Sequence, residues 1–156
     1  MCIGMKIVFF FLLLSTSLAL HAKQTLPPWF LKSFKQLKLN HGYELKGSLK
    51  PTFLVADFDG DGRPDVAILA NERRTKKKGI LIIQDDGHKY FVFGAGKKFG
   101  NGSDNFKWAT GWKIDDSNTA NKRHALFIYD TQDNKPNSGW LIYWNGKKYV
   151  WKHTGR

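Results

Sequence analysis

The sequence predicts an all-β domain with a short N-terminal helix. From Tyr43 onward, short runs of aliphatic and aromatic residues alternate with turns rich in Gly, Asn and Asp, which is the pattern of strands joined by turns. An Asp-Gly pair at 86–87 and an Asn-Gly pair at 145–146 supply the positive φ angles that tight hairpins require. A pattern of about 60 residues also occurs twice. These observations predict two four-stranded antiparallel sheets packed into one compact domain, residues 23–156.

The first 22 residues have the order of a secretory signal peptide. Lys6 precedes the apolar run 7–14, polar residues follow, and Ala22 offers a small residue for cleavage. A transmembrane anchor would need about 20 apolar residues. We therefore expect a secreted or periplasmic protein with no transmembrane anchor after cleavage. The only cysteine, Cys2, lies in this segment, so the mature domain is expected to be held together by core packing without disulfides.

Residues 28–39 are expected to form the helix. Phe30, Phe34 and Leu37 are spaced at four and three and make one apolar face, with prolines before them and the stop signal 40–42 after them. A basic amphipathic helix can lie on a membrane, but a short one next to a β domain is more often docked on that domain. We favour the docked helix.

The repeat divides the β region into unit one, about 43–100, and a degenerate unit two, about 104–156. The run 66–69 aligns with 125–128 at an offset of 59, and the turn glycines Gly87 and Gly146 are also 59 apart. Each unit then contains a strand, an acidic or polar loop, a second strand, a further loop and a hairpin. Because an open sheet would expose its edge strands, we expect the two sheets to pack on each other in a monomer.

The loop 57–65 places four carboxylates in nine positions of an otherwise basic protein. Such a density of hard oxygen ligands suits calcium, which takes six to eight oxygens and tolerates irregular geometry. An EF-hand also uses alternating carboxylates followed by Gly, but it needs Glu at position 12 and flanking helices. That position is Ile68 here, and strands are expected on both sides. The sequence therefore predicts a calcium loop outside the EF-hand class.

Residues 56–69, Ala-Asp-Phe-Asp-Gly-Asp-Gly-Arg-Pro-Asp-Val-Ala-Ile-Leu, and more loosely 93–96, resemble the FG-GAP repeat family. This family comprises the four-stranded units of integrin α-chain propellers and of bacterial VCBS repeat proteins. The resemblance implies propeller-blade-like sheets, although propellers close with four to eight blades and this chain holds two. It also implies one Ca²⁺ site, whose ligands would be the following: Asp57, Asp59, Asp61, the backbone carbonyl of Arg63, and Asp65.

The corresponding loop of unit two, 116–124, has lost most of these ligands. Asp116 matches Asp57, but Asn118, Ala120 and His124 stand where the first loop has carboxylates. We therefore expect one calcium ion per chain, with a structural role.

The formal net charge of +12 favours anionic partners in general. The run Arg73–Lys78 could contact phosphates of nucleic acid or lipopolysaccharide, or it could be a solvated turn. Alternation along 140–144 places Trp140, Ile142 and Trp144 on one side and Leu141 and Tyr143 on the other. One side is expected to be core, and rings on the other could stack on sugars or bases.

The sequence contains none of the common catalytic motifs, such as Gly-x-Ser-x-Gly, a His-x-x-x-His pair or a phosphate-binding glycine loop. It therefore favours an exported, non-catalytic binding or adhesion-type module with one structural calcium site. One alternative is a calcium-independent binder of anionic polymers: nucleic acid, lipopolysaccharide or an acidic glycan. Another is a small hydrolase or hydrolase inhibitor, for which the pairs 85–86 and 115–116 would supply carboxylates.

Overall fold

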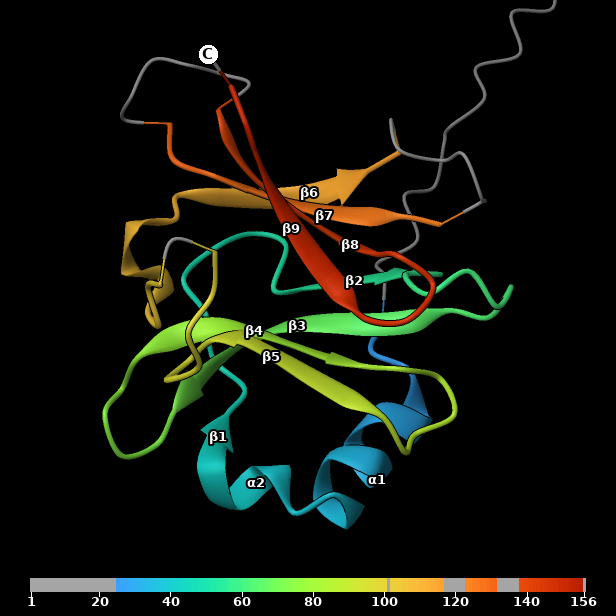
Figure 1. Ribbon diagram of the computed structural model, residues 1–156. Coiled ribbons are helices and arrows are strands. Elements are labelled where there is room, and N and C mark those ends of the chain that lie inside the picture. Colours follow the sequence, from blue (N-terminus) through green and yellow to red (C-terminus); the bar gives the residue numbers. More distant parts are fainter. Residues whose placement is uncertain (1–24, 101, 117–122, 132–137, 156) are drawn as a thin grey trace, which may run out of the picture.

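Figure 1 shows the computed structural model, which describes residues 25–100, 102–116, 123–131 and 138–155. The predicted signal peptide lies outside these residues. The elements in chain order are α1 (Pro28–Gln36), α2 (Leu39–Gly42), β1 (Tyr43–Glu44), β2 (Phe53–Ala56), β3 (Asp65–Glu72), β4 (Lys78–Ile83), β5 (Tyr90–Gly94), the 3-10 turn η1 (Phe106–Trp108), β6 (Gly111–Asp115), β7 (Ala125–Tyr129), β8 (Gly139–Trp144) and β9 (Tyr149–Thr154). Within this part of the chain, no helix is both long and apolar enough to span a membrane.

The strands form two antiparallel sheets, as the sequence predicted. In the first sheet β3 is followed by β4 and β5 on one side, and β1 and β2 pair with successive parts of its other edge. The second sheet has the order β6-β7-β8-β9. The first sheet therefore has five strands where four were expected, because the two-residue strand β1 pairs with the far end of β3. Figure 1 shows the sheets stacked, with the helices beneath the first.

The predicted helix 28–39 ends earlier and is split. Helix α1 ends at Gln36, and Lys38 has a φ of 55°, so α2 begins only at Leu39. A non-glycine residue in the left-handed region cannot continue a right-handed helix. The reversal turns the chain so that Leu39, only 4% exposed, packs with Phe30 and Phe34 against the first sheet.

The main core lies between the two sheets. Strict alternation along β3 and β4 sends Ala67, Leu69, Ile80 and Ile82 into it, whereas their neighbours face the helices. The second sheet contributes the following buried side chains: Trp112, Leu126, Ile128, Ile142 and Tyr149. Each fully buried aliphatic side chain contributes about 1.5–3 kcal/mol of hydrophobic stabilisation. The molecule thus has three layers, with the main core between the sheets and a second core between the first sheet and the helices. The loops at the ends of the sandwich lie outside these cores and can carry a site.

Candidate metal centre

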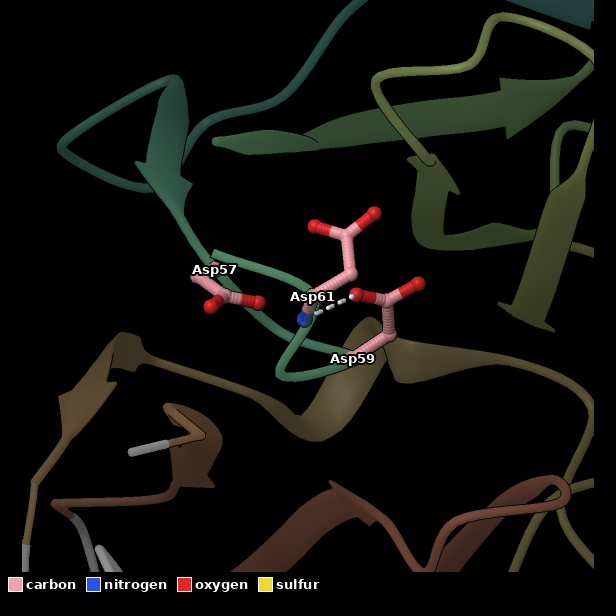
Figure 2. A group of neighbouring side chains, drawn as sticks. All are labelled: Asp57, Asp59 and Asp61. Atoms are coloured by element: carbon pink, nitrogen blue, oxygen red, sulfur yellow. Dashed lines mark hydrogen bonds between the residues drawn. The ribbon is translucent and has the colours of Figure 1, made fainter. Parts of the chain in front are cut away.

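The acidic loop joins β2 to β3 at one end of the sandwich. Ala56 pairs with Asp65 across the two strands, so residues 57–64 form the closed end of a hairpin. Figure 2 shows Asp57, Asp59 and Asp61 carried on this single turn. One carboxylate oxygen from each lies within 4.8 Å of the others. The structure therefore gathers three of the predicted ligands in a space that a single cation can occupy.

Glycine and aspartate together give the loop its shape. Gly60 and Gly62 have φ angles of 84° and 89°, a region that side-chain-bearing residues rarely adopt. Their amides donate to the Asp57 carboxylate, at 2.6 Å from Gly60 and 2.8 Å from Gly62. The amide of Asp61 likewise donates to Oδ1 of Asp59 at 3.1 Å. The backbone amides of the loop thus point towards the carboxylates of Asp57 and Asp59.

Two of the three carboxylates, Asp59 and Asp61, have pKa values shifted in opposite directions. Burial raises the pKa of Asp59, and the charges of Asp61 and Asp57 add to the effect against an opposing hydrogen bond from the Asp61 amide. The Arg63 guanidinium lowers the pKa of Asp61 by donating to its Oδ2, at 2.7 Å from Nη2. Crowded like charges of this kind favour a bound cation, because it relieves their repulsion.

Arg63 also reaches beyond the loop. Its Nε lies 3.0 Å from Oδ2 of Asp85, which follows β4. The residue was predicted as a ligand through its backbone carbonyl, and its side chain is 58% exposed. The side chain therefore acts as a counter-ion at the rim of the carboxylate group.

Asp65, the fourth predicted carboxylate, lies outside the group formed by the other three. It is fully buried, and its two oxygens accept from the amides of Phe58 at 2.9 Å and Asp85 at 3.0 Å. Burial raises the pKa of Asp65 to about 7, despite these two hydrogen bonds, and the charges of Asp59 and Asp57 contribute. Asp65 therefore ties the acidic loop to the β4–β5 turn from within the core.

Two side chains behind the loop were not predicted. Tyr149 is 7% exposed and packs in the main core. Gln84 is 2% exposed, and alternation along β4 places it on the same side as Ile80 and Ile82. The signal for Gln84 was present in the sequence as a polar residue that continues the apolar run of β4. Tyr149 belongs to unit two, so no pattern within the loop points to it.

The second loop lies against the first. The amide of His124 donates to the carbonyl of Asp57 at 2.9 Å, and Nδ1 of His124 lies 2.7 Å from Oδ1 of Asp116. Asn118 and Ala120 lie outside the described residues. The aligned positions 57 and 116 thus sit in touching loops, and Asp116 is engaged by a histidine.

The basic run Arg73–Lys78 and the basic residue Arg123 lie at opposite ends of the sandwich. Arg74, Lys77 and Lys97 line an open hollow of about 420 Å³ beside the β3–β4 turn, which also contains Glu72 and Asp104. Lys77 is paired with Asp104. Arg123, by contrast, lies near Gly146 and Gly60 at the end that carries the acidic loop. The basic groups therefore do not form one continuous face.

The aromatic residues of unit two mostly pack in the core. Trp140, Ile142 and Trp144 face the first sheet, and Leu141 and Tyr143 face away from it, as alternation predicted. The outward side chains cluster with Phe127 and Tyr129 on the other face of the second sheet. Trp151 is 47% exposed. The described residues thus hold no broad row of exposed rings for stacking on sugars or bases.

Comparison with known proteins adds no relative to this picture. No family model matches the chain, and no curated protein or solved structure is significantly similar to it.

Proposed function

We propose that the chain is an exported, non-catalytic binding or adhesion-type module stabilised by one structural calcium ion. The gathering of Asp57, Asp59 and Asp61 on one turn carries the proposal. Oxygen ligands of this hardness suit calcium better than a transition metal. The signal-like residues 1–22 and the resemblance of residues 56–69 to FG-GAP units support export and a role in binding.

The position of the loop explains how an ion would stabilise the fold. The loop closes the β2–β3 hairpin, reaches the β4–β5 turn through Asp65 and Arg63, and touches the second loop through Asp57. A bound cation would neutralise the repulsion among the three carboxylates and hold these segments together. Asp57, Asp59 and Asp61 would hold the ion, with the Arg63 carbonyl as a further oxygen.

A calcium-dependent thermal melt tests this proposal. Wild-type protein should melt at a higher temperature in millimolar calcium than in chelator, because extracellular modules bind calcium with dissociation constants of about 10⁻⁴–10⁻³ M. Asp61→Ala should abolish the difference. Asp104→Ala removes a carboxylate at the opposite end of the sandwich and should leave the calcium response intact. A wild-type melt that is unmoved by chelation would rule out the structural calcium ion.

A second candidate is calcium-independent binding of anionic polymers, which the charge of +12 favours. Retention on an immobilised anionic glycan should then fall steeply with salt and be unaffected by chelator. Lys147 and Lys148 lie in the β8–β9 turn, near Arg123 and opposite the hollow that Arg74 and Lys97 line. Replacing Arg74 and Lys97 with Gln should therefore weaken retention about as much as replacing Lys147 and Lys148. Retention that depends on calcium would instead favour the first proposal.

A further inference from the structure

Three buried polar side chains lie behind the acidic loop, on the face of each strand that points into the main core. Asp65 begins β3 and shares its face with Ala67 and Leu69. Gln84 follows β4 on the face of Ile80 and Ile82. Tyr149 begins β9 in the opposite sheet and belongs to the same core. The three groups come from both sheets and converge at the end of the sandwich that carries the loop.

Two of these side chains have unsatisfied polar atoms. Neither Nε2 nor Oε1 of Gln84, nor the hydroxyl of Tyr149, has a hydrogen-bond partner among the described residues. Leaving buried donors and acceptors unpaired is unfavourable, and native proteins normally satisfy them with protein groups, water or an ion. The orphaned atoms therefore indicate that something polar belongs beside them.

The carboxylates of the loop also affect the pKa of Tyr149. Burial raises the pKa of Tyr149, and the charges of Asp65, Asp59 and Asp57 raise it further, while the Gln84 side chain, which adjoins the hydroxyl without the geometry of a full hydrogen bond, lowers it. The Asp85 amide, one residue from Gln84, donates to Asp65. Gln84 thus adjoins Asp65, whose other oxygen accepts from the amide of Phe58 in the acidic loop.

Aromatic rings pack against Tyr149 in the main core. The ring of Phe91 lies 4.7 Å from that of Tyr149, and the ring of Trp144 lies 5.1 Å from it. Phe58, in the loop itself, is 1% exposed. Apolar rings thus flank Tyr149, and the charged groups that act on its hydroxyl are the carboxylates of Asp65 and the loop.

We propose that Gln84 and Tyr149 are part of the calcium site, supplying oxygens from the interior to the ion or to a water bound to it. The inference rests on the calcium site proposed above. It accounts for a shortfall in ligands, because calcium takes six to eight oxygens, whereas the loop gathers one carboxylate oxygen each from Asp57, Asp59 and Asp61 and adds the Arg63 carbonyl. It also makes the site a link between the sheets, since Tyr149 belongs to the second sheet.

Two conservative variants test the proposal, Gln84→Met and Tyr149→Phe. Each should weaken calcium binding roughly 10–100-fold in calorimetric titration, the usual effect of removing a group that supports a metal site. In chelator, each should melt at the same temperature as wild type or higher, because an unsatisfied buried polar atom has been removed. Gln36→Met and Tyr90→Phe are matched controls at exposed positions, and both should bind calcium as wild type does.

The possible outcomes separate the two proposals. If wild-type protein takes up no calcium, the proposed function fails and this inference fails with it. If wild type binds calcium, Asp61→Ala does not, and both interior variants bind as tightly as wild type, only the inference is overturned. The interior then holds water alone, and each variant should raise the melting temperature equally with and without calcium. A melting temperature lowered in chelator would also overturn the inference, because the polar atoms would then have partners within the protein.

Discussion

Asp65 shows how burial can outweigh hydrogen bonding at a single residue. Two backbone amides donate to its carboxylate, which would ordinarily favour the ionised form. The side chain is nevertheless wholly buried beside other carboxylates, and its pKa is raised to about 7. In the absence of a cation, the native protein therefore binds a proton at this residue that the unfolded chain releases near pH 4.

This difference predicts a pH dependence of stability in calcium-free protein. Because the native state holds the extra proton between about pH 4 and 7, the free energy of unfolding should fall as the pH rises through this window, by about 2–4 kcal/mol. Urea unfolding in chelator at several pH values would measure it. The slope should be smaller in Asp65→Asn, which cannot titrate. Equal slopes in the two proteins would show that Asp65 is ionised throughout.

The two loop glycines allow backbone strain to be separated from packing. Both have positive φ, but a Cβ at Gly60 would lie 2.4 Å from Cγ of Arg123, whereas one at Gly62 would meet nothing within 4 Å. Gly62→Ala should thus lower the free energy of unfolding only through the strain of a left-handed backbone, by about 1–2 kcal/mol. Gly60→Ala should cost about 1–3 kcal/mol more, through overpacking.

Chemical denaturation of these variants in chelator would provide the values. Combining Gly60→Ala with Arg123→Ala should recover most of the additional loss, because the clashing side chain is removed. A Gly60→Ala variant as stable as Gly62→Ala would mean that the Arg123 side chain does not pack closely against Gly60.

Among the elements, the helical segment shows where periodicity stops being informative. The spacing of Phe30 and Phe34 predicted the helix and its buried face, but it also extended the helix to residue 39. The break at Lys38 follows from the burial of Leu39 against the sheet, a tertiary contact that local pattern does not encode. Strand β1 was also missed for this reason. It has only two residues, which is too short for a hydrophobic alternation, and it is a strand only because it pairs with β3.

Docking of α1 on the first sheet gives a prediction at this scale. Phe30 is fully buried in the core between helix and sheet, and the adjacent Leu31 is 48% exposed. Phe30→Ala should lower the free energy of unfolding by about 3–5 kcal/mol. Leu31→Ala, one position away on the outer face, should change it by less than about 0.5 kcal/mol. Similar values for the two variants in urea titrations would show that the helix is not docked.

For the whole molecule, the repeat in the sequence was more informative than any single motif. The offset of 59 between residues 66–69 and 125–128 predicted two equivalent sheets, and β3 and β7 are their corresponding strands. The loop motif located Asp57, Asp59 and Asp61 because their spacing is local. It could not reveal that Asp65 would be buried or that Gln84 and Tyr149 would adjoin it, because those placements depend on how the sheets pack.

Trp112 contributes to the packing of the two sheets against each other. This β6 residue is 2% exposed in the main core, and its indole Nε1 donates to the carbonyl of Pro51, before β2, at 2.7 Å. The ring therefore fills space between the sheets and also hydrogen-bonds the second sheet to the segment that leads into β2. The main core contains side chains from both sheets, so separating the sheets would expose the apolar face of each. We therefore expect the domain to unfold in one cooperative transition.

Trp112→Phe tests this coupling. The variant leaves the Pro51 carbonyl without its donor and creates a void, so it should lose about 2–4 kcal/mol in the free energy of unfolding. Circular dichroism and tryptophan fluorescence should still report one coincident transition in urea, because the loss is shared by both sheets. Trp151→Phe, which alters a half-exposed ring in the same sheet, should have a much smaller effect. Two separate transitions in either protein would mean that the sheets unfold independently and that the main core does not unite them.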